Sequence, residues 1–231
     1  MKRFYRKAEA VRDAEGFGVA LDGRRLRTPA GATLVLPTAA LAEALAAEWQ
    51  AQEGEIQPLR MPLMRLVSTA IDRVVPRRAD VVAEIVGYAA TDLVCYRAAE
   101  PPALAARQEA VWQPLLDWMR ERYDLALPVT TGLAAPPQPA RVGVALRLVV
   151  ESYPPLPLTA LHALTTTTGS VVVGLAALEG RLDAAGVWAA AQLEEDYQIE
   201  QWGEPPEAAR RHRALREDIE ASCRFLALLR A

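Results

Sequence analysis

The dipeptide Asp22-Gly23 separates two short segments, residues 16–21 and 24–28, that can both form β-strands. Asp-Gly favours the tight turn of a β-hairpin, because both central residues of that turn take positive φ angles. The apolar residues of the first segment alternate along it: Phe17, Val19 and Leu21. The sequence therefore predicts an antiparallel hairpin near the N-terminus, with one apolar face.

Two further segments, residues 4–11 and 33–36, also have strand character, so the chain is expected to begin with a small antiparallel meander. Thr38 is placed to cap a helix that continues to residue 52. The apolar residues of this helix share one face: Leu41, Leu45 and Trp49. That face can cover the apolar side of the sheet.

From residue 62 onward, apolar residues recur every three or four positions, which is the spacing of amphipathic helices. The expected helices span residues 62–74, 80–90, 103–123, 141–152, 158–166, 169–178, 187–203 and 207–229. Residues 91–96 could extend the second helix or form a turn. We predict an α+β fold: a small N-terminal antiparallel β-meander with a covering helix (residues 1–78), followed by a larger all-helical domain (residues 79–231).

The two predicted domains differ in the sign of their charge. Residues 1–78 contain 13 Lys and Arg against 9 Asp and Glu, whereas residues 79–231 contain 13 against 20. A nucleic-acid-binding domain is expected to combine clustered positive charge with aromatic stacking residues. Neither half has that combination, and we expect no nucleic-acid partner.

The motifs of common catalytic and metal sites are missing from the sequence. His162 and His212 are 50 residues apart and belong to no HExxH or Cys/His spacing. Cys95 and Cys223 stand in apolar surroundings and are expected to be core thiols. Phosphate-binding loops of the GxxxxGK[ST] type, the GxGxxG motif and the GxSxG motif do not occur. We expect no catalytic residues, no metal and no cofactor.

No segment approaches the roughly 18 consecutive apolar residues that a membrane-spanning helix needs. The N-terminal residues also lack the apolar core of a signal peptide and the Arg/Ser-rich character of an organellar presequence. The sequence therefore predicts no membrane insertion, and either a cytoplasmic location or a chain from which a targeting segment has been removed.

Glu195 occupies an unusual position in the predicted helix 187–203. At about 100° per residue, Trp188 and Trp202 fall on the same stripe, each seven residues from Glu195. A carboxylate between large apolar residues loses hydration unless a hydrogen-bond donor or a cation compensates it. Glu195 is therefore either one half of an internal ion pair or a contact for a partner.

Seven blocks, distributed in order along nearly the whole chain, carry a family resemblance. They are FYRKAEA from Phe4, LDGRRLRTPAG from Leu21, EWQAQ from Glu48, MPLMRLVSTAID from Met61, YAATDLVCYRA from Tyr88, RQEAVWQPLLDW from Arg107 and LEEDYQIEQWG from Leu193. Together they resemble the ATP synthase assembly chaperones specific for the alpha subunit, a family that includes mitochondrial assembly factor 2 and its alphaproteobacterial relatives.

The resemblance implies a β-rich N-terminal domain, a helical C-terminal domain and no catalysis. Such chaperones hold newly made alpha subunit until it joins beta subunit, in the mitochondrial matrix of eukaryotes and, for a bacterial member, in the cytoplasm. The family's acidic C-terminal helix matches Glu194 and Glu195 here.

We therefore expect a monomeric chaperone whose partner is the alpha subunit. The candidate client-binding residues are Trp188, Glu194, Glu195, Gln198 and Trp202. The alternative is a small-molecule enzyme, such as a hydrolase, in which Asp92, Arg107 and Glu195 meet in a cleft of the helical domain.

Overall fold

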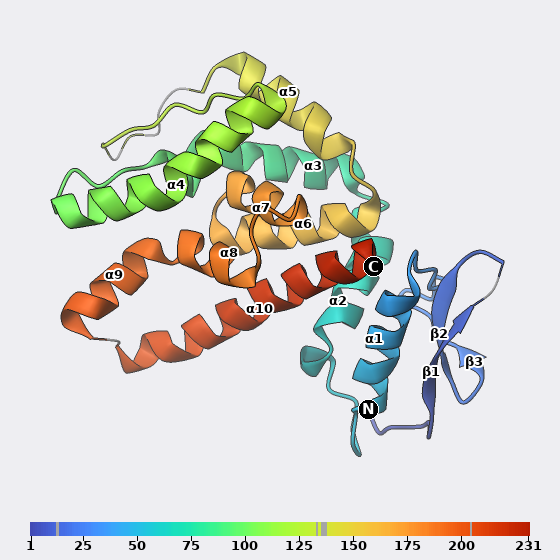
Figure 1. The fold of residues 1–231 in the computed structure, drawn as a ribbon. Coiled ribbons are helices and arrows are strands. Elements are labelled where there is room, and N and C mark those ends of the chain that lie inside the picture. The colour runs from blue at the N-terminus through green and yellow to red at the C-terminus, as the bar shows by residue number, and fades with distance from the viewer. Residues whose placement is uncertain (13, 133, 135–137, 204) are drawn as a thin grey trace. The chain divides into compact units, whose positions relative to one another are not determined.

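The computed structural model describes residues 1–12, 14–132, 134, 138–203 and 205–231. The chain divides into two compact units. Unit 1 comprises Met1–Arg78, Pro155–Ala160 and Ala221–Ala231, and unit 2 comprises Ala79–Pro154 and Leu161–Glu220. An antiparallel sheet is followed by helices (Figure 1), which confirms the α+β class. The division into domains 1–78 and 79–231 stays a prediction; unit 1 contains the first 78 residues together with two later segments.

The sheet of unit 1 has three antiparallel strands in the order β1-β2-β3. They are β1 (Ala8–Arg12), β2 (Phe17–Leu21) and β3 (Arg24–Arg25). The turn between β2 and β3 has φ angles of 47° at Asp22 and 79° at Gly23. Both angles are positive, as the hairpin turn requires, so the predicted hairpin is confirmed.

The outer segments of the meander pair less than the pattern predicts. The strand expected from residue 4 begins at Ala8, because the N–H groups of Arg6 and Lys7 donate to the Asp22 carboxylate instead of to a strand. Residues 33–36 form no extended ladder. Leu36 makes a single antiparallel bridge, in which its N–H and carbonyl groups both bond to Phe17, at 2.8 and 3.0 Å.

Helix α1 (Ala39–Gln50) packs against β1 and β2 and covers the sheet, as expected. The Thr38 hydroxyl accepts a hydrogen bond from the Leu41 N–H at 3.2 Å and so caps the helix. Leu41 and Leu45 are fully buried, and Trp49 is 8% exposed. The same Thr38 hydroxyl donates to the Leu228 carbonyl at 2.6 Å, which ties the C-terminal segment into unit 1.

Residues 58–74 of the N-terminal segment are mostly helical. The short turn η1 (Pro58–Arg60) precedes α2 (Pro62–Thr69), and α2 widens into the π-helical turn η2 (Ala70–Val74). Pro62 occupies the first turn of α2, where its missing N–H has no helical partner to lose.

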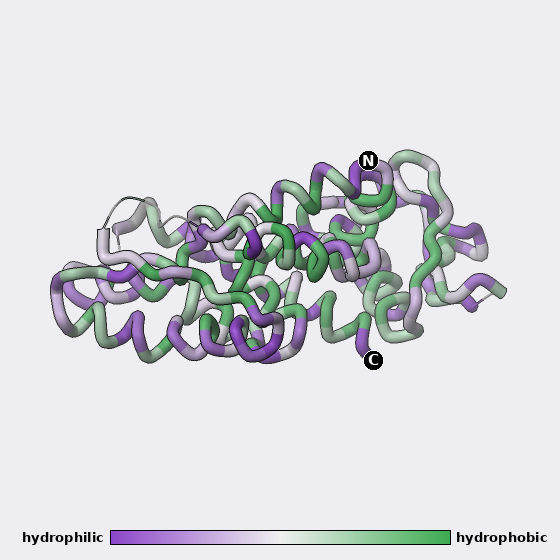
Figure 2. The backbone as a smooth tube through the Cα atoms, turned by 90° about the horizontal axis from the view of Figure 1, so that it is seen from above, coloured by the Kyte–Doolittle hydropathy of each residue, from purple (hydrophilic) through white to green (hydrophobic). Residues whose placement is uncertain are grey.

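The remaining helices of the chain are amphipathic or wholly apolar, and hydrophilic and hydrophobic residues alternate along most of the helical tube (Figure 2). Their bounds are α3 (Arg78–Gly87), α4 (Pro102–Tyr123), α5 (Ala140–Glu151), α6 (Pro155–Thr168), α7 (Val171–Leu178), α8 (Ala184–Ala191), α9 (Leu193–Trp202) and α10 (Pro206–Arg230). Every residue of α7 is buried, and α7 packs against α4 and α8. This helix is the core of unit 2.

The segment that the sequence left undecided, residues 91–96, forms turns and does not extend α3. Two 3-10 turns, η3 (Tyr88–Thr91) and η4 (Leu93–Cys95), meet at Asp92. The Asp92 carboxylate accepts a hydrogen bond from the Val94 N–H and thereby caps η4.

The single helix predicted over residues 187–203 is wrong. Gln192, with φ −109° and ψ 14°, leaves the helical region and separates α8 from α9. Its N–H still bonds to the Trp188 carbonyl, and its carbonyl still accepts from the Asp196 N–H, so the two helices remain connected by hydrogen bonds. No Gly or Pro marks this break, and apolar periodicity alone does not register the change of direction.

Candidate partner-binding site

Helices α8 and α9 carry the five candidate residues, and all of them lie in unit 2. Asp183 caps α8 by accepting from the Gly186 N–H at 2.8 Å. The first turn of α9 contains Glu194, Glu195 and Asp196. Negative charge in the first turn is favourable, because the free N–H groups there carry partial positive charge. The acidic run is therefore consistent with a helix start after Gln192.

Glu195 has two cationic or potentially cationic neighbours on α10. Its Oε1 atom lies 3.1 Å from Nε2 of His212, and its Oε2 atom lies 3.3 Å from Nη2 of Arg211. The Glu195 side chain is 34% exposed. The carboxylate is thus compensated within the chain and is also partly exposed at the surface, so the internal pairing is present and the contact with a partner stays a prediction.

Trp188 lines a hollow next to the Glu195 ion pair. Its indole N–H donates to the Asp196 carboxylate at 3.2 Å, and the Arg216 guanidinium stacks 4.4 Å from the ring centroid. The His212 ring meets the indole edge to face at 5.8 Å. A hollow of about 380 Å³ is lined by Trp188, Asp196, Ile199, His212, Arg213 and Arg216. Trp188 is half-buried and holds α8, α9 and α10 together around the hollow.

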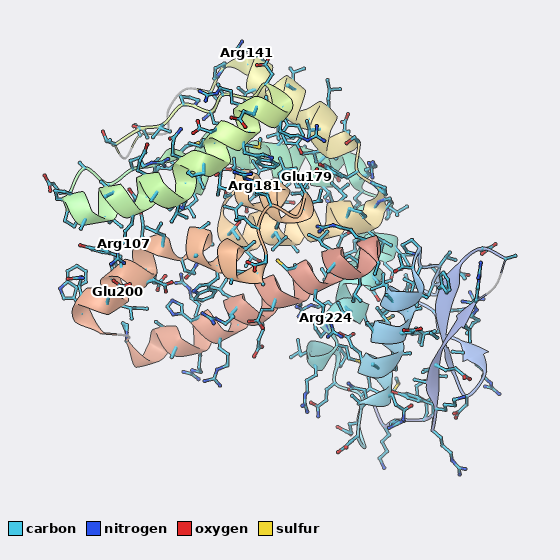
Figure 3. All side chains as sticks on the ribbon, in the orientation of Figure 1. Arg107, Arg141, Glu179, Arg181, Glu200 and Arg224 are labelled. Carbon is cyan, nitrogen blue, oxygen red and sulfur yellow. The ribbon has the colours of Figure 1, made fainter. Side chains whose placement is uncertain are left out.

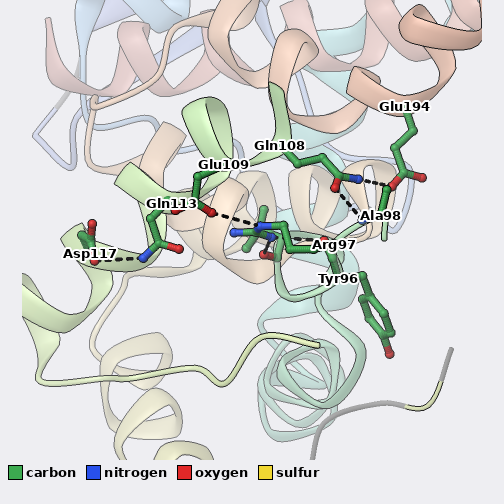
Figure 4. Close-up of polar contacts among 9 residues, drawn as sticks. Tyr96, Arg97, Ala98, Gln108, Glu109, Gln113, Asp117 and Glu194 are labelled. Carbon is green, nitrogen blue, oxygen red and sulfur yellow. Dashed lines mark hydrogen bonds and ion pairs between the residues drawn. The ribbon is translucent and has the colours of Figure 1, made fainter. Parts of the chain in front are cut away.

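Glu194 points to a different part of unit 2. It accepts a 2.5 Å hydrogen bond from the Gln108 amide of α4, and the Gln108 carbonyl oxygen accepts from the Ala98 N–H at 2.7 Å (Figure 4). Gln108 is fully buried. Glu194 therefore anchors α9 to α4, whereas Glu195, one residue later, turns to α10.

Gln198 and Trp202 are the exposed members of the set. Trp202 is 78% exposed, and α9 ends there because Gly203 takes a φ of 83°. Glu195, Gln198 and Trp202 have spacings of three and four residues, which place them on one face of α9. The three residues thus share one face of α9, whereas Trp188 of α8 contacts Asp196, His212 and Arg216.

The three residues of the hydrolase alternative have separate partners. Arg107 forms a 2.7 Å ion pair with Glu200 of α9 (Figure 3) and stacks on the Tyr197 ring at 5.0 Å. Glu195 pairs with α10 as described. Asp92 is completely buried, so the three do not share a cleft.

Asp92 is the residue that sequence reasoning undervalued. Its carboxylate accepts hydrogen bonds from the Ser170 hydroxyl at 2.6 Å and from the N–H groups of Val94 and Val172 at 3.2 Å each. Burial raises the pKa of Asp92 to about 6, although these hydrogen bonds act in the opposite direction. Asp92 joins η4 to the start of α7. No pattern in the sequence connects residue 92 with Ser170 at the start of α7.

The residues that complete the site, Arg211, His212 and Arg216, were also outside the predicted set. His212 shares a helical stripe with Leu215 and Ile219, which indicated a core or boundary position but not a partner. Arg211 and Arg216 carry no signal in the sequence that separates them from the other arginines of α10.

Among the described residues, no three His, Cys, Asp or Glu side chains are grouped so that they could hold a metal ion. In the same part of the chain, no helix is both long and apolar enough to cross a membrane.

An exposed tryptophan beside ion pairs on a helical surface is typical of a protein-binding surface. The sequence matches the family model described as ATP12 chaperone protein over residues 2–120. The chain belongs to this family of chaperones, which is involved in ATP synthase assembly. The resemblance seen in the sequence is thereby confirmed.

Several relatives are similar over the full length. The crystal structure of Atp12 from Paracoccus denitrificans has 40% identity, covers 99% of this chain and 98% of its own, and gives a TM-score of 0.92. Atu1473 from Agrobacterium tumefaciens, described as a putative chaperone, has 41% identity and a TM-score of 0.91. The match covers 99% of this chain and 86% of Atu1473. Mitochondrial protein atp12 of Schizosaccharomyces pombe is 24% identical over 241 residues, which are 99% of this chain and 81% of that protein.

Proposed function

We propose that this protein is a non-catalytic chaperone that binds the newly made alpha subunit of the F-type ATP synthase catalytic head. In this role it keeps the alpha subunit competent for assembly with beta subunit. Family membership supports a role in ATP synthase assembly. The observation that carries the binding site is Trp202, a large aromatic side chain that is 78% exposed at the end of α9.

In this proposal the face of α9 makes the contact. Trp202 inserts into the client as an aromatic anchor, and Gln198, one turn earlier, adds adaptable hydrogen bonds. Glu195 exchanges part of its interaction with Arg211 for an arginine or amide group of the client. Trp188 and Glu194 hold α9 in place from behind, through Asp196 and Gln108.

The polar residues of unit 2 support a binding role over a hydrolase. Asp92, Arg107 and Glu195 are each engaged by different partners, and the buried carboxylate of Asp92 is not accessible to a substrate.

The location we propose is the bacterial cytoplasm, which rests on the identity of 40% and 41% with the two bacterial proteins. The proposed monomer is checked by light scattering during gel filtration.

Co-purification tests this function directly. Tagged protein from a cell that makes ATP synthase is expected to enrich alpha subunit over beta subunit and over bulk protein. Trp202→Ala is expected to reduce the captured alpha subunit about tenfold or more, since an aromatic anchor contributes about 2 kcal/mol or more. Its melting temperature should stay close to that of the wild type, because the side chain is exposed.

A matched control is Leu148→Ala on α5, which removes an apolar side chain that is 65% exposed outside the proposed site. This variant should capture alpha subunit as well as the wild type does. The proposal fails if wild-type protein does not enrich alpha subunit. The site assignment fails if the Trp202 and Leu148 variants behave alike.

A further inference from the structure

A second surface, in unit 1, has the features of a binding groove and is not used by the site on α9. The groove has a volume of about 900 Å³ and lies between residues 27–30, residues 56–61 and the wall formed by α2 and η2. Its floor is apolar and includes the buried side chains Trp49, Ile56, Met61 and Met64. Methionine side chains are flexible and polarisable, so such a floor can adapt to more than one apolar group.

The floor contains a hydrogen-bond donor without an acceptor. The Trp49 side chain is 8% exposed and lines the groove, and its ring meets that of Tyr5 edge to face at 5.7 Å. The indole Nε1 atom is buried, and no acceptor for it exists among the described residues. Buried N–H groups are nearly always paired, because an unpaired donor is destabilising. An acceptor that enters between the methionines would satisfy it.

The rim of the groove is positively charged. Arg27, Arg65 and Arg73 line it, with Asp72 as the acidic residue among the lining side chains. The Asp72 carboxylate is already engaged, because it accepts from the Thr28 hydroxyl at 2.6 Å and from the Ala30 N–H at 3.1 Å. Arg27 uses one N–H on the Gly31 carbonyl, and a guanidinium has five. The rim therefore complements a carboxylate.

Large apolar side chains stand exposed at the same rim. Leu59 is 85% exposed and Met1 is 75% exposed. A site for a small molecule encloses its ligand and buries its apolar lining. Here the apolar surface continues out of the groove onto the rim, so the occupant that fits it extends beyond the groove as well.

We propose that this groove binds an extended segment of a partner polypeptide in which apolar side chains flank a carboxylate. The apolar side chains lie on the methionine floor and against Leu59. The carboxylate pairs with the arginines of the rim, and an acceptor of the segment receives the Trp49 N–H. This proposal does not depend on the identity of the client bound by α9.

Fluorescence anisotropy with the full-length protein tests the groove. The probes are a fluorescein-labelled peptide of alternating Leu, Phe and Glu residues, and its counterpart in which every Glu is Lys. The acidic peptide is expected to bind at least about tenfold more tightly. Arg73→Glu and Leu59→Asp should each weaken its binding about tenfold, the first by charge repulsion and the second by loss of apolar contact.

Each groove variant has a matched control in unit 1. Arg24→Glu reverses an exposed arginine outside the groove, and Val75→Asp replaces an apolar side chain that is 54% exposed outside it. Both controls should bind the acidic peptide within about twofold of the wild type. Trp49→Phe removes the indole N–H but keeps an aromatic ring, and it should weaken peptide binding about threefold to tenfold.

Three results would overturn the proposal. The two peptides could bind equally, or the groove variants could match their controls while circular dichroism shows that all are folded. Dodecanoate, a single-chain carboxylate, could bind in a manner sensitive to Arg73→Glu while the acidic peptide does not, which would make the groove a site for a small amphipathic acid. These peptide measurements are independent of whether Trp202→Ala loses alpha-subunit capture, so the groove and the site on α9 can fail separately.

Discussion

Asp92 and Glu195 are two carboxylates of unit 2, and the structure compensates them in different ways. Asp92 is fully buried and receives hydrogen bonds from a hydroxyl and two backbone N–H groups. Glu195 is 34% exposed and lies beside two side chains of α10. Backbone donors are fixed in place, whereas exposed side chains can exchange partners. The difference indicates that Asp92 holds the fold, whereas the Glu195 carboxylate remains partly exposed at the surface.

The largest effect on the free energy of unfolding is expected from Asp92→Ala. This change leaves the Ser170 hydroxyl and the N–H groups of Val94 and Val172 without their acceptor in the core. Each unsatisfied buried donor costs about 1–3 kcal/mol, so the free energy of unfolding should fall by about 3 kcal/mol or more. Urea denaturation measures it. Asp92→Asn, which keeps an acceptor oxygen, should lose clearly less, and equal losses would show that the hydrogen bonds are not the cause.

An intermediate effect on the free energy of unfolding is expected from a change of pH. Burial raises the pKa of Asp92 from 3.8 to about 6. Between these two pH values, the folded state therefore binds a proton at Asp92 more tightly than the unfolded state does. The contribution of Asp92 to stability is then greatest below pH 4 and is lost as pH rises through 6, by up to about 3 kcal/mol. The stability of the wild type relative to Asp92→Asn, measured in urea from pH 4 to 7, should fall accordingly. A constant difference would contradict the raised pKa.

The smallest effect on stability is expected from Glu195→Gln. Exposed ion pairs contribute about 0–1 kcal/mol, so the change in unfolding free energy should stay below about 1 kcal/mol. Capture of alpha subunit should nevertheless decrease, because the charge on the face of α9 is lost. Glu217→Gln, a change of an exposed acid on α10, is the matched control for both measurements. A collapse of the melting temperature in Glu195→Gln would make this residue a structural acid like Asp92, and the contrast between the two would disappear.

Much of the local structure could be predicted from the sequence. The hairpin at Asp22-Gly23, the cap at Thr38 and the buried face of α1 depend on neighbours within a few residues. The break at Gln192 could not be predicted, because no Gly or Pro marks it. The N–H and carbonyl groups of Gln192 also still form helical hydrogen bonds, with Trp188 and Asp196. Across the break, the Trp188 indole N–H donates to Asp196 of α9, whereas Trp202 at the end of α9 is 78% exposed.

The structure gives the five candidate residues neighbours that the sequence did not indicate, and their role in binding stays a prediction. All five predicted residues lie on α8 and α9, yet Glu194 turns to Gln108 of α4 while Glu195 turns to α10. Adjacent positions of a helix diverge by about 100°, so their divergence was expected, but their partners were not.

The sequence by itself determined the α+β class, the hairpin, most of the helices and the presence of an acid among tryptophans, because turn chemistry, caps and apolar periodicity act over a few residues. Only the tertiary structure decided how each charge is compensated. The partners of Asp92 and Glu195 lie up to 80 and 17 residues away along the chain. Such pairs form because chain packing places donors beside a carboxylate that has lost its water, and no local pattern records which donors these are.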